Sequence, residues 1–254
     1  MENLTRCGGW GMRYDVLKEL LVAQGGEPLR MNAYVAMDRE REAQDLDYRR
    51  RKEEYRNALR REGIHVVRKL VKRYRDSENQ LVMKANADLD LAIDALLQSE
   101  NLDYVLLGTG DGDFLRLVRA LQSRGKRVDL LSFSNTSREL REEVDYHFSG
   151  YLVPGLISYP SDPPERQRGI MHGVNEEKGF GFLTYSTGLR ITDARDDVFC
   201  HISDFTVNGN PISNDAFASL KTRQAIIEFD LVEQDDGRVK AVNATEFKPK
   251  QYER

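Results

Sequence analysis

The chain has 254 residues, of which 40% are hydrophobic and 31% charged, and its formal net charge at pH 7 is −4. That length suits one large domain or two modest ones. It holds no run of 18 apolar residues, its first residues lack the profile of a signal peptide, and its two cysteines, Cys7 and Cys200, lie in no metal-binding spacing. A transmembrane helix, a disulfide framework and a zinc site are therefore excluded, and a soluble, cytoplasmic protein is expected.

Helical patterns and short apolar runs alternate through the first part of the chain. Strands separated by helices of 10 to 15 residues form parallel βαβ units with helices on both faces. We therefore expect an α/β domain with a parallel, three-layer, Rossmann-like sheet. The patterns predict helices over residues 12–24, 47–62, 85–98 and 114–123, and strands over residues 29–36, 64–70, 104–107 and 127–133.

A proline-rich segment separates this part from the next. Residues 158–168 hold three of the seven prolines and show no periodicity, as expected of an exposed linker. After it the apolar period changes to two, which is typical of a small all-β barrel. The pattern predicts strands over residues 180–185, 197–202, 224–232 and 238–244. We place the first domain at residues 1–155, the linker at 156–167 and the second domain at 168–254.

Two acids follow the predicted strand over residues 104–107. The segment TGDGDF places Asp111 and Asp113 directly before a helix. In open α/β sheets, ligands bind beyond the carboxyl ends of the strands, where these carboxylates would lie. Two acids one residue apart repel each other unless they are protonated, hydrogen-bonded or bridged by a cation. The alternative is that Asp111 serves only as the N-cap of the helix.

Three more acids, Asp88, Asp90 and Asp94, lie on the predicted helix over residues 85–98. Each of them alone is explained as a solvated surface acid, and the helix dipole favours an anion at Asp88, near the helix start. A functional role for these acids depends on their combination with the turn that carries Asp111 and Asp113.

In this combination the sequence resembles a known family. Lys84, Asp88 and Asp94, followed by TGDGDF and by the strand GKRVDLL, resemble the NYN domain, the PIN-like nuclease fold of LabA-like proteins. The resemblance covers about residues 1–150 and implies acidic residues that hold Mg²⁺ or Mn²⁺ and an activity that cleaves RNA. It implies metal-binding and catalytic roles for Asp88, Asp111 and Asp113, and supporting roles for Asn3, Lys84, Asp94 and Thr109.

One departure from the family concerns the first strand. Family members open with an apolar strand that ends in a pattern like I-D-x-E-N-L, whereas this chain begins inside that pattern. The family's first strand is central in the sheet, so its absence would leave unpaired backbone groups, each costing on the order of 1 to 3 kcal/mol if buried. We expect that the start codon was placed about ten residues late. A chain without the strand would also lack one metal ligand.

The chemistry implied by the resemblance is a metal-activated attack of water on RNA. The four histidines are scattered along the sequence, and no Ser/His/Asp spacing suggests a covalent mechanism. The expected activity is therefore that of a Mg²⁺- or Mn²⁺-dependent endoribonuclease.

Positive charge is concentrated between residues 39 and 75, where 14 Lys and Arg stand against 7 Asp and Glu. Arg49, Arg50 and Arg51, on the predicted helix over residues 47–62, could contact phosphates and guide RNA toward an acidic centre that would otherwise repel it. The alternative is a solvated face in which glutamates of the same helix pair with the arginines.

Aromatic residues alternate in the predicted barrel. Period two places Phe180 and Phe182 on one face, and likewise Phe199 and His201. Flat side chains on an exposed sheet stack on nucleobases, which contributes about 1 to 3 kcal/mol per base. The alternative is that aromatic residues fill the barrel core. We favour a core position for Phe205, Phe217 and Phe229.

The segments KGFGF and VFCHIS resemble the two ribonucleoprotein motifs of a cold-shock domain. The resemblance covers residues 168 to about 247 and implies a five-stranded OB barrel that binds single-stranded RNA or DNA through Lys178 and the aromatic face. Two departures weaken the expected affinity. Gly173 and Val174 replace an aromatic pair of the family, and residues 168–254 hold 11 basic against 14 acidic side chains.

Together these patterns predict a metal-dependent ribonuclease whose cold-shock domain holds single-stranded RNA. Tethering the two domains would raise the concentration of substrate near the active site. The alternatives are a non-catalytic RNA-binding regulator and an adaptor protein, each with a degenerate metal site.

Overall fold

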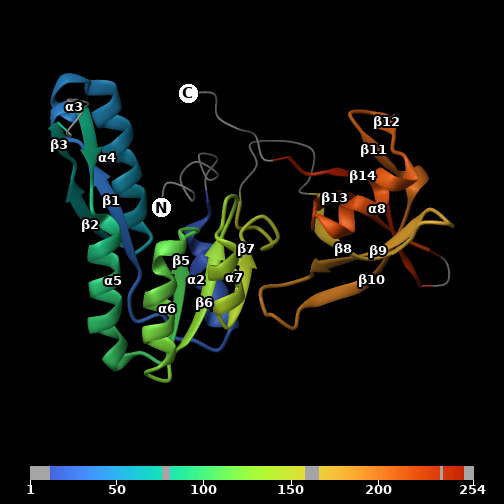
Figure 1. Cartoon of the computed structure of the whole chain (residues 1–254), viewed down its shortest axis with the longest axis horizontal. Coiled ribbons are helices and arrows are strands. Elements are labelled where there is room, and N and C mark those ends of the chain that lie inside the picture. Colours follow the sequence, from blue (N-terminus) through green and yellow to red (C-terminus); the bar gives the residue numbers. More distant parts are fainter. Residues whose placement is uncertain (1–11, 76–80, 158–165, 235–236, 249–254) are drawn as a thin grey trace. The chain divides into compact units, whose positions relative to one another are not determined.

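The computed structural model describes residues 12–75, 81–157, 166–234 and 237–248 (Figure 1). Contacts within the chain divide it into two compact units, of which the first contains Gly25–His147 and the second contains residues 12–24 and 148–248. In the described ranges, no helix is long and apolar enough to cross a membrane.

Helices and strands alternate in the first unit. Its strands are β1 (Asn32–Met37), β2 (His65–Leu70), β3 (Lys72–Arg75), β4 (Leu81–Lys84), β5 (Tyr104–Gly108), β6 (Arg127–Ser132) and β7 (Tyr146–Ser149), within which the boundary between the units falls. Its helices are α3 (Arg39–Gln44), α4 (Leu46–Arg61), α5 (Ala87–Gln98), α6 (Leu115–Gln122) and α7 (Arg138–Glu143), with 3-10 turns η1 (Ser99–Asn101) and η2 (Gly112–Phe114).

Polar side chains start three of these helices. The Asp38 carboxylate accepts a hydrogen bond from the backbone N–H of Arg41 at 3.1 Å and caps α3, and Asp45 accepts one from Tyr48 at 2.8 Å and caps α4. The Ser137 hydroxyl caps α7 in the same way. Such N-caps satisfy backbone donors that a helix leaves unpaired, so local sequence determines where these helices begin.

The parallel strands form two sheets. β1 pairs in parallel with β2, and β5 pairs in parallel with β6, which is followed in the same sheet by β7. β3 and β4 form a separate antiparallel hairpin. The predicted parallel α/β architecture is therefore confirmed, but the strands within residues 12–75 and 81–157 are not joined in one continuous sheet. Among the described strands, β1 and β5, like β2 and β7 at the other edges of these sheets, each have a single hydrogen-bonded neighbour and hence one open edge.

The helix α5 connects the two sheets. Leu91, Ala92, Ala95 and Leu96 pack against a buried cluster that includes Leu107 of β5. From β1, the Tyr34 hydroxyl donates to Asp94 at 2.9 Å and the Asn32 amide donates to Gln98 at 3.4 Å. The helix α5 is thus held from two sides. It packs against the core of the β5 sheet, and it accepts hydrogen bonds from side chains of β1.

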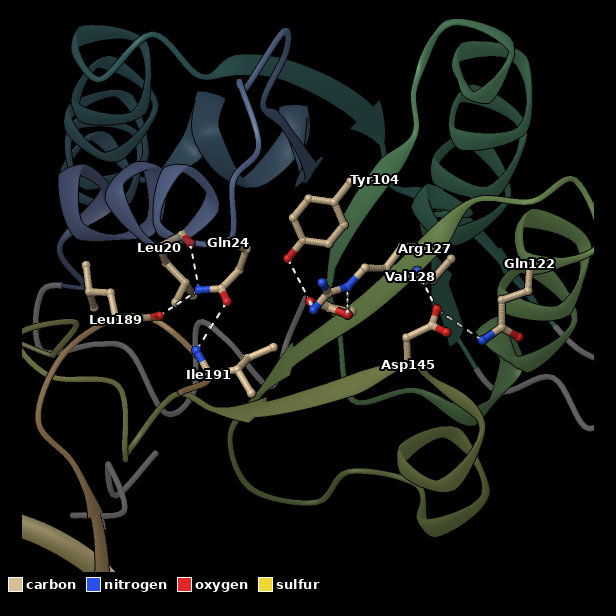
Figure 2. Close-up of polar contacts among 10 residues, drawn as sticks. Leu20, Gln24, Tyr104, Gln122, Arg127, Val128, Asp145, Leu189 and Ile191 are labelled. Carbon is tan, nitrogen blue, oxygen red and sulfur yellow. Dashed lines mark hydrogen bonds and ion pairs between the residues drawn. The ribbon is translucent and has the colours of Figure 1, made fainter. Parts of the chain in front are cut away.

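A buried carboxylate, that of Asp129, links β5 and β6; Figure 2 labels its partners Tyr104 and Arg127. Asp129 is fully buried; it accepts a hydrogen bond from the Tyr104 hydroxyl at 2.9 Å and two from Arg127 at 3.0 and 2.8 Å. Burial and the neighbouring Asp129 charge raise the pKa of Tyr104, so its hydroxyl stays a donor at neutral pH. Because a buried charge without partners is costly, the three side chains stabilise this sheet only as a set.

The second unit contains a closed barrel (orange to red in Figure 1). Five strands lie side by side in the order β10, β9, β8, β13 and β14, and a parallel pairing of β10 with β14 closes the barrel. This confirms the predicted five-stranded barrel. The elements are α2 (Tyr14–Ala23), β8 (Gln167–Asn175), β9 (Phe180–Ser186), β10 (Ala194–His201), η3 (Ile202–Asp204), β11 (Phe205–Val207), β12 (Asn210–Pro211), α8 (Asn214–Thr222), β13 (Ile226–Glu233) and β14 (Val239–Glu246).

The barrel core holds the three phenylalanines predicted to fill it. Phe205, Phe217 and Phe229 are each at most 1% exposed and belong to one buried cluster. Cys200 is buried in the same cluster, and burial raises the pKa of its thiol to about 12. This cysteine is therefore a core residue with an unreactive thiol.

The helix α2 is attached to the barrel through Gln24 (Figure 2). The Gln24 side-chain amide donates to the carbonyl oxygens of Leu189 at 2.6 Å and Leu20 at 3.2 Å, and its oxygen accepts from the N–H of Ile191 at 3.3 Å. One side chain thus binds the loop between β9 and β10 through both its donor and its acceptor.

Candidate active site and nucleic-acid interface

The acidic turn, residues 109–113, follows β5 at the carboxyl end of the sheet. Thr109 is buried, and its hydroxyl accepts a hydrogen bond from the N–H of Asp111 at 3.2 Å. The Asp111 carboxylate in turn accepts one from the N–H of Asp113 at 3.0 Å and caps η2. The capping role considered for Asp111 is therefore real, and it leaves both aspartates exposed.

The local packing favours glycine between the two acids. A Cβ atom at Gly112 would lie 3.0 Å from the Ser137 hydroxyl oxygen and 3.1 Å from its Cβ, tighter than ordinary van der Waals contact. The N–H of Ser137 also donates to the carbonyl of Gly110 at 2.9 Å. The acidic turn is thus fixed against the loop that follows β6, so the ends of two adjacent parallel strands determine its position.

The acids of α5 have different surroundings. Asp88 lies exposed in the first turn of the helix. Asp94 accepts the Tyr34 hydrogen bond, and Asp90 pairs with Lys69 at 2.7 Å. Desolvation raises the pKa of Tyr34, with Asp94 as the next cause, so the tyrosine remains the donor. Asp94 is therefore engaged in holding α5 to β1.

Two predicted supporting residues cannot be placed. Asn3 lies outside the described residues, as does the pattern at the chain start that it belongs to. The backbone of Lys84 ends β4, but its side chain is not described.

The expected three-carboxylate centre is not gathered in the described part of the chain. There, no group of three or more His, Cys, Asp or Glu side chains lies close enough together to hold a metal ion. The acidic turn offers two exposed carboxylates, those of Asp111 and Asp113, separated by one residue. This donor set fits a hard cation such as Mg²⁺, which is commonly bound by one or two carboxylates together with water and substrate phosphates.

A buried polar network lies at the end of β6. Ser132 is 1% exposed, and its hydroxyl oxygen lies 2.7 Å from His147 Nε2 and 2.7 Å from the Thr136 hydroxyl. Burial, with a smaller contribution from Arg141, lowers the pKa of His147 to about 4. The imidazole is therefore neutral at pH 7. No sequence motif marks these three residues, so the network could not be predicted from the sequence.

The basic stretch divides into exposed and structural charges. Arg49 and Arg50 are exposed and make long ion pairs, with Glu53 at 3.8 Å and Asp47 at 3.6 Å, while Arg51 of the same turn is exposed. Exposed pairs of this kind contribute about 0 to 1 kcal/mol, so phosphates can compete for these side chains. Both the predicted RNA-guiding face and the predicted pairing with acids are thus compatible with the geometry of α4.

Other basic residues serve the fold. Arg56 is buried and binds both carboxylate oxygens of Glu42, at 2.8 and 3.1 Å. Arg73 pairs with Asp38 at 2.6 Å and also with Glu40. These arginines neutralise acids within the unit and are poor candidates for phosphate contacts.

The aromatic platform, made of Phe180, Phe182, Phe199 and His201, lies on β9 and β10. The Phe180 ring centroid lies 5.9 Å from that of Phe182 and 5.4 Å from that of Phe199. Phe199 lies 6.0 Å from Phe182 and stacks with His201 at 6.4 Å. The predicted period-two alternation thus brings the four rings together on one face, with Phe182 37% exposed.

A glycine positions these rings. A Cβ atom at Gly181 would lie 2.8 Å from the carbonyl oxygen of Gly173 and 2.9 Å from the sulfur of Met171. Only glycine allows this close approach, so β8 and β9 pack tightly beneath the phenylalanines. Lys178 is exposed in the preceding turn, where its N–H donates to the Asn175 side chain at 2.9 Å.

Known proteins share sequence with both parts of the chain. The NYN domain model matches residues 1–152, and the cold-shock DNA-binding domain model matches residues 167–247. The chain is 32% identical over 112 residues to the low amplitude and bright protein LabA of Synechococcus elongatus, a match that covers 43% of this chain and 60% of LabA. A solved structure of a protein of unknown function from Vibrio parahaemolyticus matches with a TM-score of 0.47 and 24% identity, over 58% of this chain and 84% of that one.

Proposed function

Because this chain belongs to the NYN-domain family and carries a cold-shock domain after its NYN domain, we propose that it is a metal-dependent ribonuclease. In this proposal the first domain cleaves RNA and the barrel holds the single-stranded substrate. The observation that supports cleavage most is the acidic turn, where two exposed carboxylates project at the carboxyl end of a parallel sheet.

We assign the metal, Mg²⁺ or Mn²⁺, to Asp111 and Asp113. Asp88, the third ligand implied by the resemblance, would join them only after a rearrangement, because the described residues hold no group of three such side chains. When bound, such an ion lowers the pKa of water and neutralises charge on phosphate oxygens. Thr109 supports the turn through its hydrogen bond to the N–H of Asp111. Asp94 keeps α5 in place through Tyr34, so its contribution is positional.

The barrel has a different task in this proposal. Its platform of four aromatic rings offers flat surfaces on which the bases of single-stranded RNA, or of single-stranded DNA, can stack without any excess of positive charge. Lys178 and the arginines of α4, Arg49 to Arg51, would add phosphate contacts.

The cleavage proposal is tested with a labelled single-stranded RNA in the presence of Mn²⁺, Mg²⁺ or a chelator. We expect cleavage with either ion, its loss with the chelator, and its loss in Asp111→Asn. The matched control is Asp103→Asn, an exposed acid that precedes β5. Cleavage that resists the chelator, or that persists in Asp111→Asn, would contradict the assignment.

A second candidate function is a non-catalytic RNA-binding regulator. It is favoured by the lack, among described residues, of a group of three acids able to hold a metal. In that case the protein would bind single-stranded RNA with and without divalent ions and would never cleave it. The upstream strand expected from the sequence stays a prediction, and the same assay on a chain extended in frame tests whether it increases activity.

A further inference from the structure

The strand β8 carries a bulge directly beside the aromatic platform. Met171 pairs with Leu183, and the next paired residue, Gly173, is opposite Phe182, so His172 is the extra residue of the bulge. Cross-strand partners share a face, which places Gly173 on the face of Phe182. Two consecutive residues of β8, His172 and Gly173, are therefore directed toward the platform, where regular alternation would allow only one of them.

The His172 ring contacts the edge of the platform. Its centroid lies 6.5 Å from that of Phe182, at an interplanar angle of 32°. Gly173 leaves space beside this contact, since a Cβ atom there would lie 3.9 Å from the Phe182 ring. The position that bears an aromatic residue in the resembled family is thus without a side chain here, and a neighbouring residue supplies a ring.

A hydrogen bond fixes the orientation of this ring. His172 Nε2 lies 2.7 Å from the carbonyl oxygen of Asp196, so this nitrogen donates. Asp196 lies in β10, at a second irregularity between Arg195 and Val198. Because β8 and β10 pair with opposite edges of β9, the His172 side chain reaches across β9. A ring held in this way loses little conformational freedom when a ligand stacks on it.

His172 is nevertheless exposed. Its Nε2–H is committed to Asp196, so the flat face of the imidazole and the acceptor Nδ1 remain for a ligand. From His201 through Phe199 and Phe182 to His172, each ring contacts the next at 6.0 to 6.5 Å between centroids. The row of ring contacts is therefore continuous from the end of β10 to the bulge of β8, with the Phe182 ring turned by 71° relative to that of Phe199.

We propose that His172 is a fifth stacking residue, which binds one further nucleobase of the single strand beside Phe182. This inference rests on the proposed nucleic-acid function of the barrel. A purely structural His172 would use only its hydrogen bond to Asp196 and would hold β8 against β10. The stacking role requires the aromatic ring of residue 172, whereas the structural role requires only its hydrogen-bond donor.

Two variants separate the ring from the donor. His172→Gln keeps an N–H that can reach the Asp196 carbonyl but removes the aromatic face, and His172→Phe keeps a ring but removes the donor. Affinity is measured on the full chain with fluorescent oligouridylates of about 4 to 16 nucleotides, at a salt concentration that suppresses phosphate contacts. The control is His65→Ala, an exposed histidine of β2.

Loss of one stacked base should weaken binding of His172→Gln by about 5- to 150-fold and shorten by one nucleotide the oligomer that reaches full affinity. His172→Phe and His65→Ala should stay within about threefold of the parent. A parent that binds no oligouridylate contradicts the proposed function of the barrel itself. If the parent binds, two results overturn the stacking role. One is an affinity of His172→Gln equal to that of the parent, and the other is a loss of affinity in His172→Phe as large as that in His172→Gln. Thermal unfolding of each variant shows whether it is folded. If His172→Gln is misfolded, the affinity of His172→Phe decides: affinity close to that of the parent supports the stacking role, and a large loss contradicts it.

Discussion

The acidic turn and the aromatic platform differ in how they are assembled. The platform is built from neighbouring strands of one barrel, and its rings are in mutual contact without any ligand. The acidic turn presents two carboxylates from one loop, while Asp94, another acid assigned to the site, binds Tyr34. Stacking needs only flat surfaces, whereas a metal centre needs oxygen atoms from separate elements at defined distances. A binding surface can therefore be complete within one strand pairing, and a metal site depends on the packing of several elements.

The largest expected effect is a loss of cleavage without any loss of binding, which would distinguish the acidic turn from the aromatic platform. Asp113→Asn removes a metal-binding charge with little change of shape, so metal-dependent RNA cleavage should disappear while affinity for single-stranded RNA and the unfolding midpoint stay unchanged. Single-turnover cleavage and fluorescence anisotropy on the same preparation measure both. A variant that loses binding together with cleavage would show that the two regions do not act independently.

Acid should weaken the first unit through His147. Its folded pKa of about 4 lies below the unfolded value of about 6.5, so the unfolded state binds the proton more readily. The contribution to stability is thus fully present above about pH 6.5 and decreases as the pH falls toward 4, by on the order of 2 to 3 kcal/mol. Urea unfolding of the first unit at pH 7 and pH 5 measures this loss, and His147→Gln should reduce the difference. An equal loss in that variant would assign the pH dependence to other groups.

Phe182→Ala should weaken binding of single-stranded RNA by about 1 to 3 kcal/mol, because one stacking surface is removed. The dependence of affinity on salt should stay nearly unchanged, since no phosphate contact is lost. Val232→Ala, an exposed apolar residue of β13, is the matched control. If Phe182→Ala binds like the parent at every salt concentration, the platform is not the binding surface.

The smallest expected effect concerns the salt dependence itself. Replacing Arg49, Arg50 and Arg51 by alanine should flatten the slope of log affinity against log salt by up to about 2, because three phosphate contacts on a single strand are removed. Binding titrations between low and moderate salt measure this slope. If the triple variant keeps the slope of the parent, the three arginines make no phosphate contacts and belong to a solvated face of α4. The matched control replaces three exposed arginines elsewhere, Arg30, Arg124 and Arg190.

Much of the fold could be predicted because hydrophobic periodicity reports burial directly. The helix predicted over residues 47–62 is α4, Leu46–Arg61, and the strand predicted over 104–107 is β5, Tyr104–Gly108. The hairpin of β3 and β4 was missed, since the exposed sequence KRYR of β3 carries no alternation. The helix α2 was predicted as a helix, but its grouping with the second unit rests on distant contacts such as that of Gln24 with Leu189, which no local pattern contains.

The candidate site shows the same limit. The acidic turn could be predicted because Thr109, Gly112 and both aspartates act within five residues of each other. The commitment of Asp94 to Tyr34 could not, because the two residues are 60 positions apart. His172 escaped notice for another reason: period two assigns faces only to regular strands, and a bulge shifts every assignment beyond it.

The open edges of β1 and β5 have a consequence for how the protein behaves at high concentration. Each edge presents a row of backbone N–H and C=O groups that no described strand covers. Such rows are templates for pairing with the strand of another molecule, and natural sheets commonly protect them with charges or prolines. The sequences NAYVAM of β1 and YVLLG of β5 contain neither. Self-association should therefore begin in the first unit, and amide hydrogen exchange, which is slow only for bonded groups, should locate it on these two strands.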